Sequence, residues 1–89
     1  MIYHNHTNRF IQLLYIMYDK EEKYLKSVGK NISRIRKSKG FSQLDVCATI
    51  SMEKSNLSSI ENGRQNPTTL TLKKIADAID VQVKEFFVF

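Results

Sequence analysis

Residues 42–62 read SQLDVCATISMEKSNLSSIEN, and this stretch decides the fold. Its apolar residues recur at helical spacing on both sides of the tripeptide 51–53, which predicts two helices and a tight turn between them. We expect the first helix over about 43–50 and the second over about 54–61. Two short helices joined by a three-residue turn form a helix-turn-helix unit.

Residues at the ends of these helices support the assignment. Ser42 is a favourable N-cap, and Asp45 follows in the first turn, where a carboxylate is stabilised by the helix dipole. Asn62-Gly63 is a stop signal for the second helix. The side chains expected to face inward are Val46, Cys47, Ile50, Leu57 and Ile60.

Helical spacing continues on both sides of this unit. A helix is expected over about 28–39, followed by Gly40 as a left-handed C-terminal cap. Thr69 is expected to cap a helix over about 70–79, and Val83, Phe86 and Phe87 suit a fifth, short helix. We therefore predict an all-α, compact five-helix domain over residues 28–89 and an N-terminal extension over residues 1–27 that is partly helical.

The extension contains the apolar run FIQLLYIMY over residues 10–18. Nine residues are too few to span a bilayer, and no small-residue cleavage site follows, so neither a membrane anchor nor a signal peptide is expected. Three interpretations remain open. The run is a helix that packs on the domain, or a dimerisation arm, or part of an over-long reading frame whose true start is Met17.

Chain length and residue content exclude several classes of protein. Eighty-nine residues are enough for one domain, and one Cys excludes an internal disulfide, so we expect a reducing, cytoplasmic location. One Cys with His4 and His6 does not make a four-ligand zinc site, and we expect no metal or cofactor. No phosphate-binding loop and no nucleophile with a neighbouring base is present, so we do not expect an enzyme.

The excess of positive charge is concentrated in the middle of the chain. The net charge is +5, and residues 28–64 carry seven basic against three acidic side chains, a net of +4. A basic patch over a helix-turn-helix unit is typical of a nucleic-acid binder.

A set of motifs spread over residues 28–88 resembles the Cro/repressor-type (XRE) helix-turn-helix family, whose domain is lambda-repressor-like. The matching residues are Arg36, Ser42-Gln43, Ile60-Glu61-Asn62-Gly63, Asn66-Pro67 and Val81 with Phe86-Phe87. The resemblance implies a sequence-specific transcriptional regulator, a repressor or autoregulator. As a homodimer it would bind double-stranded DNA at an inverted-repeat operator with half-sites about 34 Å, or 10 bp, apart.

The resemblance also implies roles for particular residues. Arg36 and Glu61 are expected to form a structural ion pair, and Gln43 to contact a phosphate. On the outward face of residues 54–61, Lys54 and Ser55 are the first candidates for base contacts, followed by Ser58 and Ser59. The residues expected to contact phosphate are Lys39, Ser42, Gln43, Asn56, Asn62 and Arg64.

Three positions depart from the family pattern. Ser51 stands where the turn usually has Gly, and a left-handed conformation there costs a residue with a side chain about 1 kcal/mol. Cys47 replaces a small Ala between the two helices, and we interpret it as packing. Asp80 replaces a common Gly.

Two other functions remain open for this sequence. One is an antitoxin or accessory regulator whose main partner is a protein, bound through Phe10, Leu13, Leu14 and Met17, which lie at the spacing of a helix laid in a groove. The other is a protein-interaction module that has lost DNA binding.

Overall fold

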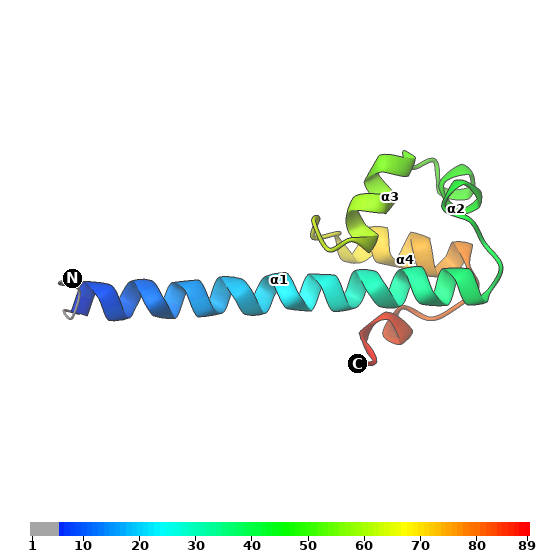
Figure 1. The fold of residues 1–89 in the computed structure, drawn as a ribbon. Helices are drawn as coiled ribbons and strands as arrows, with labels where there is room; N and C mark the ends of the chain where they lie inside the picture. Colours follow the sequence, from blue (N-terminus) through cyan, green and yellow to red (C-terminus); the bar gives the residue numbers. More distant parts are fainter. Residues whose placement is uncertain (1–5) are drawn as a thin grey trace.

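A computed structural model describes residues 6–89. These residues form helices joined by turns and loops, and no strand occurs among them (Figure 1). The prediction of five helices needs one correction, because four of the elements are α-helices and the last is a 3-10 helix. The elements are α1 (His6–Ser38), α2 (Gln43–Ile50), α3 (Lys54–Glu61), α4 (Thr69–Ala78) and the 3-10 helix η1 (Val83–Phe87).

The fifth helix is a 3-10 helix because the hydrogen bonds at its start join residues that are three positions apart. The backbone N–H of Glu85 donates to the carbonyl of Gln82 at 3.0 Å, three residues back, and the Gln82 N–H donates to the Glu85 carboxylate at 3.0 Å. Three-residue closure of this kind gives a 3-10 turn, and such turns are short.

The first helix is much longer than the 28–39 expected for it. α1 runs without a break for 33 residues and passes through position 28, where the sequence placed the start of the domain. Exposed i,i+4 ion pairs stabilise its middle, Asp19 with Lys23 at 3.2 Å and Glu22 with Lys26 at 3.1 Å. It ends at Ser38, and Gly40 takes the expected left-handed conformation at φ 85°.

The core lies where α1 is covered by the other helices. Figure 1 shows α3 on one side of α1 and η1 on the other, with α4 alongside. α2 packs on α3 and α4. The buried apolar side chains are Val28, Ile32, Ile35, Val46, Cys47, Leu57, Ile60, Leu72, Ile75, Ala76, Ile79 and Phe86.

The N-cap of α4 is Thr68, one residue before the Thr69 expected. The Thr68 backbone is extended, and its hydroxyl accepts a hydrogen bond from the Thr71 N–H at 3.1 Å. Thr69 is instead the first residue of the helix. After α4, Asp80 adopts a left-handed conformation at φ 57°.

Two glycines let α1 and α3 approach closely. A Cβ on the buried Gly29 would overlap the backbone carbonyls of Ile60 and Glu61. A Cβ on Gly63, which has φ 72°, would lie 2.6 Å from the Cα of Lys26. The end of α3 is therefore held against α1 by backbone contact, which fixes the position of α3 in the domain.

The C-terminal residues are held against α1 by hydrogen bonds and by contacts between aromatic rings. The Asn31 side chain donates to the carbonyls of Phe86 at 3.1 Å and Val88 at 3.0 Å. The Tyr24 ring lies 6.4 Å from the Phe87 ring and 5.6 Å from the Phe89 ring. Within residues 6–89 no helix has the length and apolar character needed to cross a membrane.

Candidate nucleic-acid interface

The helix-turn-helix unit forms with the boundaries expected from the sequence. At its start Ser42 and Asp45 make a reciprocal capping box, because the Asp45 N–H donates to the Ser42 hydroxyl at 3.0 Å and the Ser42 N–H donates to the Asp45 carboxylate at 2.8 Å. The hydrogen bond from the Ser42 backbone N–H, and after it the Ser42 side chain, holds the pKa of the Asp45 carboxyl below its usual value. The start of α2 is thereby fixed.

The turn between the two helices is left-handed at its first residue. Ser51 has φ 55° and ψ 48°, and its N–H donates to the carbonyl of Cys47. The side chain of Cys47 is buried, as predicted, and burial raises the pKa of its thiol. A buried, protonated thiol is a packing group and not a nucleophile.

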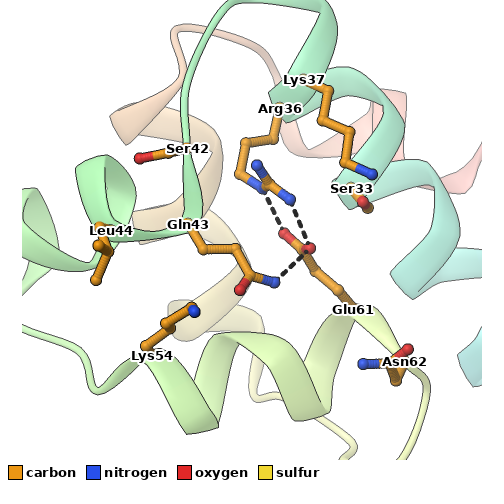
Figure 2. A pocket seen from close by; sticks show the side chains of 9 residues that line it. All are labelled: Ser33, Arg36, Lys37, Ser42, Gln43, Leu44, Lys54, Glu61 and Asn62. Carbon is orange, nitrogen blue, oxygen red and sulfur yellow. Dashed lines mark hydrogen bonds and ion pairs between the residues drawn. The ribbon is translucent and has the colours of Figure 1, made fainter.

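The predicted pair of Arg36 and Glu61 is present and joins α1 to the end of α3. Figure 2 shows the guanidinium facing the carboxylate, with Nε to Oε2 at 2.7 Å and Nη2 to Oε1 at 2.9 Å. Arg36 also donates to the carbonyl of Phe41 at 2.8 Å. The bonds to Glu61 raise the pKa of Arg36. A bidentate, buried pair of this kind fixes geometry.

Gln43 belongs to the same network, which the sequence did not reveal. Its side-chain N–H donates to Glu61 Oε1 at 2.9 Å, so the amide is held against the base of α3 (Figure 2). An ionised carboxylate is an acceptor only, so the amide must present its nitrogen to Glu61 and its oxygen outward. The ion pair therefore also positions the first residue of α2.

A hollow opens in front of this network, between α1, the start of α2 and α3. Lys37 and Lys54 are its cations beyond the internally neutralised Arg36 and Glu61 pair. Free N–H groups at the start of a helix and nearby lysines both favour a bound anion. The residues that line the hollow are Ser33, Arg36, Lys37, Ser42, Gln43, Leu44, Lys54, Glu61 and Asn62.

The outward face of α3 carries the four side chains proposed for base contacts. Lys54 and Ser55 are exposed, whereas Ser58 and Ser59 are half-buried. The Asn62 side chain donates to the Ser58 carbonyl at 2.8 Å and approaches its hydroxyl at 3.4 Å. Lys54 and Ser55 are therefore the more accessible of the four.

The residues proposed for phosphate contacts fall into separate places. Ser42, Gln43 and Asn62 share the hollow with Lys54. Asn56 lies with Ser55 in a second hollow beside α4. Arg64 lies in a third hollow, which Glu21 and Glu22 of α1 also line, and Lys39 is exposed after the end of α1.

Three residues of the main hollow, Ser33, Lys37 and Leu44, were not among the predicted site residues. Ser33 lies four residues before Lys37 on the same side of α1, which a helical projection of the basic residues would have shown. Leu44 is an exposed apolar residue directly after Gln43, and nothing in the sequence marked it.

This fold and this face define a helix-turn-helix domain of the class found in DNA-binding transcriptional regulators. The chain belongs to the helix-turn-helix family HTH_3, which it matches over residues 32–86. The resemblance to XRE-type domains drawn from the sequence is thereby confirmed. The family is one of regulators and not of enzymes.

Relatives and solved structures agree with this assignment. An uncharacterized HTH-type transcriptional regulator, y4dJ of Sinorhizobium fredii, is 45% identical over 56 residues, which are 63% of this chain and 73% of that protein. The immunity repressor protein of Bacillus phage phi105 is 35% identical over 57 residues, 64% of this chain but 40% of that protein. The restriction-modification controller protein C.AhdI of Aeromonas hydrophila superposes with a TM-score of 0.68 at 27% identity, over 71% of this chain and 96% of that one.

Proposed function

We propose that this protein is a sequence-specific repressor or autoregulator that places α3 in the major groove of double-stranded DNA. The observation that carries the proposal is the joining of Lys54, at the start of α3, to the basic hollow at the start of α2. A helix that enters the groove needs both elements, since phosphate contacts position the domain and base contacts select the sequence.

Each part of the face has a task in this proposal. Lys54 donates to guanine O6 and N7, and Ser55 contacts the neighbouring base edge, with Ser58 and Ser59 further along the helix. Ser42, Gln43 and Asn62 face phosphate from the rim of the hollow. Lys39, Asn56 and Arg64 lie outside the hollow and contact flanking phosphates.

We further propose that the protein acts as a homodimer on an inverted repeat. Two domains related by a two-fold axis present two recognition helices, and half-sites about 34 Å, or 10 bp, apart put both helices on one side of the duplex. The operator would then be palindromic, as the two-fold symmetry requires.

Selection from a randomised duplex library at about 150 mM salt tests this function. The full chain should enrich an inverted repeat, and Lys54→Ala should relax the preference at one position in each half-site. Lys84→Ala is the matched control, because it removes one exposed positive charge from η1, across α1 from α3 (Figure 1). Failure of the full chain to enrich any sequence would overturn the proposal.

Charge reversal separates this function from a protein-interaction module that has lost DNA binding. Lys54→Glu and Arg64→Glu should each weaken DNA binding, because each replaces an attraction to phosphate by repulsion. Unchanged affinity in both variants would show that the DNA face has been placed wrongly.

A further inference from the structure

The N-terminal half of α1 extends beyond the domain without cover. Figure 1 shows this part of the helix projecting away from α3, α4 and η1. Every side chain from residue 9 to residue 24 is exposed. Eight large apolar side chains, between 49% and 74% exposed, lie in this part: Phe10, Ile11, Leu13, Leu14, Tyr15, Ile16, Met17 and Tyr18.

The exposed apolar area of this segment is larger than the largest apolar patch on a typical monomer. Taking about 200 Å² for a fully exposed large apolar residue, the eight side chains present roughly 900 Å² to solvent. The largest apolar patch on a typical monomer is about 300–600 Å². One side of a standard protein interface covers about 800 Å². Because these side chains lie on nearly every side of the helix, a second helix laid along the segment would cover part of this area.

We propose that residues 10–18 form a homodimer contact in which two α1 helices lie antiparallel about a two-fold axis near Leu14. The segment has no charged residue, and Gln12 is its one polar residue, so it fits a partner surface that is equally apolar. The same segment of a second copy is such a surface, and a two-fold contact uses one patch on both chains.

Charge selects the antiparallel arrangement. With Leu14 at the centre, residues 6–9 of one chain lie opposite residues 19–22 of the other. The first group contains Arg9 and the positive end of the helix dipole, whereas Asp19, Lys20, Glu21 and Glu22 sum to −2. A parallel pair in register would set each group against its own copy.

The acidic group remains available for this contact. Asp19 and Glu22 pair with Lys23 and Lys26 inside α1, but the side chains of both pairs are about half to three-quarters exposed. Exposed pairs of this kind contribute little and rearrange readily. The carboxylates can therefore face the positive end of a second helix without losing a strong internal bond.

This inference adds to the proposed function by naming a contact that joins two copies. It does not set the half-site spacing, because α3 meets α1 at Gly29 and two such points lie about 45 Å apart across Leu14. It is tested without DNA. Sedimentation analysis of the full chain should show a dimer at micromolar concentration. Leu14→Glu places two like charges at the two-fold axis and should raise the dimer dissociation constant at least about 30-fold. Leu70→Glu is the control, because Leu70 is also an exposed leucine, on α4, and it should leave the dimer intact.

Helicity and the urea midpoint verify that both variants are folded, since Leu14 is exposed and lies outside the core. Ile11→Glu gives a second test at a neighbouring position. A monomeric full chain, or a dimer that survives both Leu14→Glu and Ile11→Glu, would overturn the proposal. A monomeric full chain would assign the segment to a different protein or to a lipid surface. DNA selection by a monomer would leave the proposed DNA face standing.

Oxidative cross-linking tests the direction of the helices. Chains with Phe10→Cys and chains with Tyr18→Cys are mixed and oxidised, while the buried Cys47 stays protected. An antiparallel pair joins the two different chains, because positions 10 and 18 are equally far from Leu14. Cross-links between identical chains alone would show a parallel pair and overturn the antiparallel proposal.

Discussion

Arg36 and Glu61, 25 residues apart in the sequence, form a bidentate ion pair whose side chains are 6% and 5% exposed. The pair ties the last turn of α1 to the end of α3, and Gln43 is bonded to the same carboxylate. The orientation of α3 and the position of the first residue of α2 therefore depend on one buried contact. This contact links the packing of the core to the shape of the proposed DNA face.

Breaking this pair should be strongly destabilising. Arg36→Ala leaves the Glu61 carboxylate buried without its cation, which costs about 3–5 kcal/mol of unfolding free energy. Urea denaturation measures the loss. Lys73→Ala is the matched control, because Lys73 and Asp77 pair at the same 2.7 Å but with side chains 62% and 59% exposed.

The control should lose no more than about 0.5 kcal/mol, since exposed pairs on one helix contribute little. Equal losses in the two variants would mean that burial of the Arg36 and Glu61 pair does not set its contribution.

Ser51→Gly should stabilise the domain. Ser51 is held at φ 55°, a left-handed conformation that costs residues with a side chain about 1 kcal/mol and glycine almost nothing. Thermal denaturation should show a higher melting temperature. Because the conformation of the turn is unchanged, DNA affinity should be unaltered. A lower melting temperature would mean that the Ser51 side chain makes a stabilising contact.

Two left-handed glycines should respond differently to alanine. Gly40→Ala meets no atom within 4 Å and should cost about 1 kcal/mol, the conformational term alone. Gly63→Ala adds an overlap with the backbone of Lys26 and should cost about 3 kcal/mol or more. Chemical denaturation of both variants compares the two costs. A similar loss in each would show that α1 and α3 can separate at this point.

The capping box predicts a dependence of stability on pH. Because the folded pKa of Asp45 is lowered, its stabilising effect is complete above the unfolded value of about 3.9 and is lost as pH falls through the folded value. Asp45→Asn should therefore be less stable than the parent at pH 6, and the difference should shrink toward pH 3. A difference that stays constant over this range would exclude the carboxylate as its origin.

Much of this fold could be predicted from local sequence. The ends of α2 and α3, the turn over residues 51–53 and the buried Leu57 and Ile60 follow from caps, spacing and one stop signal. The pairing of Arg36 with Glu61 came from resemblance to a family. The bond from Gln43 to Glu61 could not be predicted, because it joins two helices whose relative position the local sequence does not determine.

The length of α1 was missed for a physical reason. The core-facing stripe of apolar residues, which predicts the start of this helix, begins at Val28. Before that residue the segment 10–18 is apolar on nearly every side, so no single face marks it as part of the same helix. The sequence also does not decide whether Thr68 or Thr69 is the N-cap of α4, because threonine is a favourable N-cap residue at either position.

The affinity of Lys54→Ala for the selected duplex tests the central claim most directly. Fluorescence anisotropy at about 150 mM salt would compare the parent chain, Lys54→Ala and the control Lys84→Ala. The account predicts a loss of about 1–3 kcal/mol, or roughly 5- to 150-fold, for Lys54→Ala, with relaxed preference at its base pair. It predicts little change for Lys84→Ala. Equal affinities for all three chains would contradict the placement of α3 in the major groove.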